Sequence, residues 1–226
     1  MDYFIYYGLT IVALLISGGA SLFIKLTYNS NSKINNAKGI LGKDAARKIL
    51  DKNGLSNVDV ESTSGYLSDH YDPTTKKVNL SSTNFGEASI AAVAVAAHEC
   101  GHAIQDKVGF LLMRIRHALV PVVNLCSYAG YIAIAVGCLF SLLNLVWIGI
   151  IAEGAILLFQ LVTLPVEIDA SRRALKEIKS MGILESSEYR RGKRVLIAAA
   201  LTYVAGVLSA LIQILRLLLM FTRRRD

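Results

Sequence analysis

The chain has 226 residues, a formal net charge of +7 and 54% hydrophobic residues. Its mean hydropathy of +0.47 is too high for a soluble globular protein, so we expect much of its surface to face lipid. The basic residues border apolar segments and are not interleaved with aromatic residues, which argues against nucleic-acid binding. The three cysteines form no CxxC pair, which argues against a disulfide framework or a thiolate metal site.

Four apolar segments are each close to the length of about 20 residues that a helix needs to cross a bilayer. They are residues 4–26, 118–143, 145–166 and 195–221. The first lacks the basic start of a secretory signal, so residues 1–26 are interpreted as a retained transmembrane anchor. Residues 118–166 are predicted to form a transmembrane helical hairpin, and 195–226 a C-terminal hydrophobic helix with a basic tail.

Lysine and arginine residues cluster after the first span, before the second and after the third. Under the positive-inside rule these loops lie in the cytoplasm, which predicts a multi-pass protein of the cell membrane. The orientation of the last helix stays open, because Arg223–Arg225 would then lie on the external side.

Two polar regions remain, and we place both in the cytoplasm. In residues 27–117, an amphipathic helix over 42–54 precedes alternating segments around Asn57–Ser62 and 76–81, with a turn at Asp72-Pro73-Thr74. An Ala-rich helix is predicted over 86–105, and helices again over 167–194, where the third span is expected to continue as a helix through EIDASRRALKEIKSMG into the cytoplasm. The predicted fold class is therefore a mainly α membrane protein with about four hydrophobic helices and a small α+β region.

The sequence His98-Glu99-Cys100-Gly101-His102 is an HExxH motif on the Ala-rich helix. This spacing places both imidazoles on one helical face, one turn apart, where they can bind one Zn²⁺. Glu99 projects about 100° around the helix and can act as general base on a zinc-activated water. The motif therefore predicts hydrolysis of peptide bonds, with Glu99 as the catalytic residue.

A catalytic zinc site needs a third protein ligand on another element. We predict Glu167, because it follows the third span on the same side as the motif. Asp169 is the second candidate, or a carboxylate that orients a histidine. His117 borders a span, and Glu153 lies too deep within one to reach the motif.

The whole chain resembles the bacterial membrane-bound neutral zinc metallopeptidases of the YugP type. The resemblance rests on the segments LSDHYDPTTKKVNLSS, VAAHECGHAIQD, RIRHALVPVVN, LFQLVTLPVEIDASRRAL and ALTYVAGVLSALIQILRLLL. The chain is more distantly similar to HtpX-type and CAAX prenyl proteases, whose third ligand is the Glu of an ExxAD segment. This similarity implies that Glu167 is the third ligand and Ala170 a small packing residue. Ser171 replaces the Asp of that pattern, and Asp169 is a candidate to take over its role.

The resemblance also implies a gluzincin-like catalytic region, in which the strand before the metal helix binds the substrate backbone as an added strand. Here that strand is Lys77–Ser81, with Val78 and Asn79 as candidate substrate contacts. His70 and Tyr71 are further candidates, near the oxyanion or in a structural role in the hairpin.

The leading function is a zinc metalloendopeptidase that cleaves peptides or membrane proteins. One alternative is a membrane scaffold with a structural or inactive zinc site, against which Glu99 argues, since such a site needs no base. A second is a site-2-type intramembrane protease, against which the short apolar run before His98 argues. The same ligands also accept Mn²⁺, Fe²⁺ or Co²⁺. The substrate, the partner subunits and the oligomeric state stay open.

Overall fold

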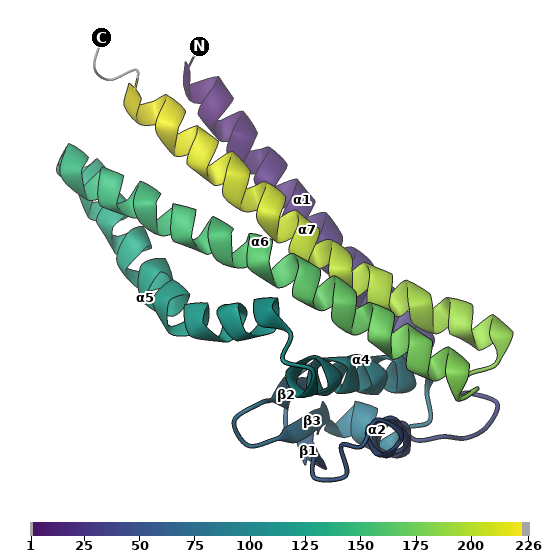
Figure 1. Cartoon of the computed structure of the whole chain (residues 1–226). Coiled ribbons are helices and arrows are strands. Elements are labelled where there is room, and N and C mark those ends of the chain that lie inside the picture. Colours follow the sequence, from purple (N-terminus) through teal and green to yellow (C-terminus); the bar gives the residue numbers. More distant parts are fainter. Residues whose placement is uncertain (1, 223–226) are drawn as a thin grey trace. The chain divides into compact units, whose positions relative to one another are not determined.

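The structure is a computed structural model that describes residues 2–222. Its elements in chain order are α1 (Asp2–Ser32), α2 (Gly42–Lys52), β1 (Asp59–Thr63), β2 (His70–Asp72), β3 (Lys77–Ser81), α3 (Ser82–Gly86), α4 (Ile90–Lys107), α5 (Leu111–Leu139), α6 (Leu143–Ser180) and α7 (Ser186–Thr222) (Figure 1). This mainly helical chain with a small sheet confirms the predicted fold class. The basic tail Arg223–Arg225 lies outside the described residues.

Within residues 2–222, four helices are long and apolar enough to cross a membrane, namely α1, α5, α6 and α7. Each predicted apolar segment lies on one of them, and α6 continues as a helix through Ser180, beyond the end of the predicted span at residue 166. The predicted end of α1 at residue 26 is too early and the predicted start of α7 at residue 195 is too late, because polar residues extend both helices without changing the backbone.

The chain divides into two compact units. The first unit comprises Met1–Ser21, Arg114–Pro165 and Leu201–Asp226. Within it, side-chain hydrogen bonds join α1 to the C-terminal half of α7. They link Tyr6 Oη to the Leu219 carbonyl (3.0 Å), Thr10 Oγ1 to Arg216 Nη1 (2.9 Å) and Ser17 Oγ to Ser209 Oγ (2.7 Å). The residue numbers of the bonded partners rise along α1 and fall along α7, so the two helices are antiparallel there. Polar groups hold them together, as in other membrane helix pairs.

The second unit comprises Leu22–Met113 and Val166–Ala200 and contains the sheet. Its strand order is β1-β3-β2, with β3 parallel to β1 and antiparallel to β2. The hairpin of β2 and β3 confirms the turn predicted at Asp72-Pro73-Thr74. The parallel pairing of β1 was not predicted.

The expectation that β3 accepts a substrate as an added strand is wrong. β1 pairs with β3 along its whole length, and β2 pairs with Lys77–Asn79 on the other side. The carboxylate of Asp69 accepts a hydrogen bond from the Ser81 amide at 2.8 Å and so covers the remainder of that side. Because β3 lies in the centre of the sheet, it has no free backbone edge for a peptide.

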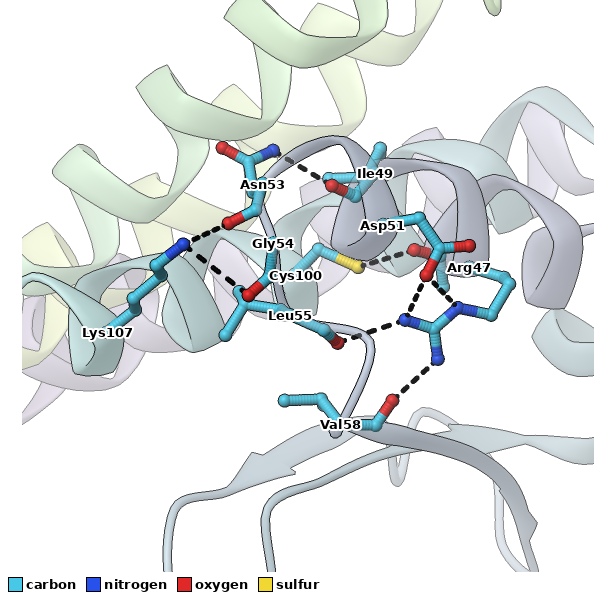
Figure 2. A network of polar contacts seen from close by, with 10 residues as sticks. Arg47, Ile49, Asp51, Asn53, Gly54, Leu55, Val58, Cys100 and Lys107 are labelled. Atoms are coloured by element: carbon cyan, nitrogen blue, oxygen red, sulfur yellow. Dashed lines mark hydrogen bonds and ion pairs between the residues drawn. The ribbon is translucent and has the colours of Figure 1, made fainter.

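Helix α4 lies in the core of the second unit and is buried along most of its length. On one side it packs against the apolar face of α2, where Ala45, Ala46, Ile49 and Leu50 are fully buried. Figure 2 shows how the loop that follows α2 is held: Arg47 donates to the carbonyls of Leu55 (3.0 Å) and Val58 (2.7 Å). Lys107 at the end of α4 donates to the carbonyls of Asn53 and Gly54. These contacts fix the position of α4 relative to α2 and the sheet.

Candidate metal centre

The motif histidines and Glu167 meet inside the second unit. His98 and His102 lie on one face of α4, with ring centroids 4.8 Å apart. The Nε2 atoms of His98 and His102 lie 3.1 Å and 3.6 Å from the same oxygen of Glu167 on α6, Oε2. The third ligand predicted from the sequence therefore lies beside the two histidines, and all three ligand atoms are within 4.8 Å of one another.

These distances match what a tetrahedral metal ion requires. Zinc binds imidazole nitrogen and carboxylate oxygen at about 2.0–2.2 Å, which places neighbouring ligand atoms about 3.3 Å apart. The separations of 3.1 Å and 3.6 Å bracket that value. The donor set of two imidazoles and one carboxylate is that of catalytic zinc sites, which leave a further coordination position for water or substrate.

A close crossing of α4 and α6 brings the ligands together. Gly101 lies between the two histidines, and a Cβ atom placed on it would be 2.4 Å from the carbonyl oxygen of Ala170. Ala170 itself is fully buried. Both helices need a small residue here, which agrees with the packing role that the resemblance implied for Ala170. Glu167 is one turn before Ala170, so the crossing places its carboxylate opposite the histidines.

A chain of hydrogen bonds fixes the orientation of His102. Gln105 Nε2 donates to the Val166 carbonyl at 2.8 Å and to Asp169 Oδ2 at 2.9 Å. Because both partners are acceptors, Oε1 of Gln105 is the atom that faces His102 Nδ1, at 2.9 Å, and it can only accept. Nδ1 of His102 therefore carries the proton, and Nε2 keeps its lone pair for a metal. Arg173 donates to the same oxygen of Asp169 at 2.6 Å and completes the chain.

Ser171 has a similar position relative to His98. Its hydroxyl lies 3.2 Å from His98 Nδ1, the nitrogen that faces away from Glu167. The serine thus occupies the place where the similar proteases have an aspartate, and a hydroxyl can accept the Nδ1 proton there. Asp169 does not replace that aspartate at His98. It acts on the other histidine, through Gln105.

Glu99 is buried next to the ligands. Burial raises the pKa of its carboxyl to about 7; the charge of His98 lowers that pKa, and the charges of Glu167 and Asp69 raise it further. A carboxyl in such a place takes up and releases a proton near neutral pH, as a general base must.

The other predicted residues lie around β2. The hydroxyl of Tyr71 donates to Asp106 at 2.7 Å, and burial together with this carboxylate raises the pKa of Tyr71 above its usual value. His70 Nδ1 lies 2.8 Å from the Ser68 carbonyl, and Asn79 donates to His70 Nε2 at 3.2 Å. Val78 is fully buried in the core and is not positioned to touch a substrate. Tyr71 therefore ties β2 to the end of α4, whereas these bonds of His70 and Asn79 join the hairpin to the loop before it.

Sequence reasoning missed Gln105. It is fully buried and lies one turn after His102, on the side that faces α6. A polar amide on an Ala-rich helix, three residues after a candidate metal ligand, was the available signal.

Comparison with known proteins agrees with this geometry. The model of the family described as "Putative neutral zinc metallopeptidase" matches residues 6–222. The chain belongs to this family. It is also 43% identical over 218 residues to "Putative membrane protease YugP" of Bacillus subtilis (strain 168), covering 96% of this chain and 97% of that protein. No solved structure matches the chain. The matched residues include nearly all of the four candidate membrane helices as well as the candidate metal centre.

Proposed function

We propose that this member of the zinc metallopeptidase family is a membrane-bound endopeptidase with one zinc ion per chain, held by His98, His102 and Glu167. The observation that carries the proposal is the convergence of both Nε2 atoms on one buried carboxylate oxygen, at 3.1 Å and 3.6 Å. The hydrogen bond from His102 Nδ1 to Gln105 supports it, because it leaves the Nε2 lone pair of His102 available, and the Ser171 hydroxyl is placed where it can accept the Nδ1 proton of His98 in the same way.

When bound, zinc supplies Lewis-acid chemistry: it polarises the substrate carbonyl and makes a water molecule more acidic. Glu99 removes a proton from the water that attacks the carbonyl carbon. The carboxyl of Glu99 then delivers this proton to the amide nitrogen as the C–N bond breaks, so that the products are a carboxylate and an amine. Glu99 ends each cycle as it began, so the same carboxylate serves both proton transfers.

Two features favour this reaction over the alternatives. A structural zinc site needs no ionisable group beside its ligands, yet Glu99 is buried next to His98. A site-2-type protease would carry the motif on a membrane-crossing helix, whereas the part of the chain that the structure describes has its candidate spans in α1, α5, α6 and α7, not in α4. The basic residues that flank the spans support a site on the cytoplasmic side of the membrane.

The test is a Glu99→Gln variant of the full chain, purified in nanodiscs. Gln is nearly isosteric with Glu and leaves all three ligands in place, so we expect wild-type zinc content and a loss of cleavage of about 1,000-fold or more. Glu87→Gln is the matched control, because Glu87 is exposed and on the same unit. Cleavage by Glu99→Gln at the wild-type rate would refute the proposed base. Zinc binding without cleavage of any membrane-protein substrate by the wild type would favour the scaffold function.

A further inference from the structure

The loop between β1 and β2 exposes two large apolar side chains. Tyr66 is 60% exposed and Leu67 is 40% exposed. Leu67 has a φ of 54°, a left-handed conformation that is uncommon for a residue with a branched side chain, and Gly65 before it has a φ of 112°. The backbone of this loop is thus bent sharply at a point where apolar side chains point outward.

The loop is fixed against α1 within the same compact unit. The hydroxyl of Tyr66 donates to Asn29 Oδ1 at 2.7 Å. The ring of Tyr66 also meets the ring of Tyr28 edge-on, with centroids 5.8 Å apart. Tyr28 in turn donates to Asn84 at 2.8 Å, so the loop is held by a buried group and not by surface contacts alone.

Helix α1 changes its surroundings at this point. This helix is a candidate membrane span, and it exposes Leu22, Phe23 and Leu26. The side chain of Leu26 is 59% exposed. Two residues later Tyr28 is only 2% exposed, so α1 enters the protein body there. Lys25, also exposed, lies at the same level, where a basic side chain can reach the lipid headgroups. The membrane boundary on α1 therefore falls near Lys25–Tyr28, within about 6 Å along the axis from Asn29.

We propose that the tip of this loop, Tyr66–Leu67, inserts into the interfacial region of the lipid bilayer. The loop is bound to α1 through Asn29 and Tyr28, directly after the last exposed apolar residue of that stretch, Leu26. Tyrosine suits this depth, because its ring favours the apolar region while its hydroxyl needs a polar partner, here Asn29.

The loop leads directly to the sheet and the metal centre. Asp69, which follows it, accepts hydrogen bonds from the Ser81 amide at 2.8 Å and from Asn84 at 2.9 Å. Through these bonds the residue that follows the tip is joined to β3 and to α3, within the unit that holds the metal ligands.

The experiment uses tryptophan fluorescence of the full chain in nanodiscs. The single tryptophan is removed by Trp147→Phe, and one new tryptophan is introduced by Leu67→Trp, Tyr66→Trp or, as control, Thr74→Trp. Thr74 is exposed in the turn at the other end of β2, away from the tip. We expect lipids brominated near the headgroup end of their acyl chains to quench emission at positions 66 and 67 by about twofold or more, and not at position 74.

Equal quenching at positions 67 and 74, or none at 67, would overturn the proposal. A third result would also overturn it: brominated lipid has no effect on the tryptophan at position 67, but a peptide substrate shields that tryptophan from an aqueous quencher. The loop would then contact the substrate and not the lipid. If Leu67→Trp fails to fold, judged by its gel-filtration profile, the same comparison is decided by Tyr66→Trp.

Discussion

Replacing Gly101 by alanine adds one methyl group at the closest contact between α4 and α6. A Cβ atom there lies 2.4 Å from the carbonyl oxygen of Ala170 and 3.0 Å from its carbonyl carbon. Ordinary van der Waals contacts begin at 3.4 Å. Because backbone atoms, and not a flexible side chain, are in the way, the two helices have to move apart by about 1 Å.

This separation is large for a metal site. His98 Nε2 and Glu167 Oε2 are now 3.1 Å apart. A shift of about 1 Å takes these two atoms well beyond the spacing of about 3.3 Å between neighbouring ligand atoms of a tetrahedral metal. The metal cannot compensate, because metal–ligand distances vary by only about 0.2 Å. We expect zinc affinity to fall by about 100-fold or more. Loss of a group that only hydrogen-bonds to a metal ligand lowers metal affinity by about 10–100-fold, and here a ligand itself is displaced. Competition with a chromophoric chelator measures this affinity on the purified protein.

The control is Gly86→Ala in α3, where no atom lies within 4 Å of the added Cβ. Alanine is the better helix former by about 1 kcal/mol in a helix interior, so helix propensity alone predicts that Gly101→Ala is stabilised and that Gly86→Ala, at the last residue of α3, is changed little. A loss of zinc affinity confined to Gly101→Ala thus reports the helix crossing. Wild-type zinc affinity in Gly101→Ala would refute the reasoning that this crossing sets the ligand distances.

Three further predictions concern the groups around the ligands. Gln105→Leu removes the acceptor for His102 Nδ1, and chelator competition should show a loss of zinc affinity of about 10–100-fold; an unchanged affinity would mean that the amide does not orient the ring. Ser171→Asp gives His98 a charged acceptor and should raise zinc affinity in the same assay, whereas a loss would show that the carboxylate does not fit. Tyr71→Phe leaves a carboxylate on α4 without this donor and should lower the free energy of unfolding in denaturant by about 1 kcal/mol, with no change in zinc content; an unchanged midpoint would contradict a role in holding β2.

The helices were the part of the fold that the sequence predicted best. Long apolar segments have few alternatives to a membrane helix, and the continuation of α6 past residue 166 followed from its unbroken pattern. The sheet was predicted only in part. Alternation identifies strands, but strand order depends on contacts between distant segments, so the parallel pairing of β1 with β3 left no local signal. The expected substrate strand was wrong for this reason.

In the candidate site, too, local sequence patterns predicted some residues, whereas contacts between distant segments were missed. The HExxH spacing on one helix predicted the two histidines, and position relative to the third span indicated Glu167. The link from His102 through Gln105 to Asp169 crosses 64 residues of sequence and depends on the orientation of one amide, which no local pattern encodes. Ser171 was regarded as a departure from a known pattern, yet in the folded chain it contacts His98 directly.

Zinc titration of the metal-free protein tests the central claim most directly, with bound zinc and cleavage of a membrane-protein substrate measured on the same samples. The account predicts that cleavage is absent without metal and that binding and cleavage saturate together at about one zinc per chain. Cleavage that persists after complete removal of metal, or zinc binding that saturates without any cleavage, would contradict it.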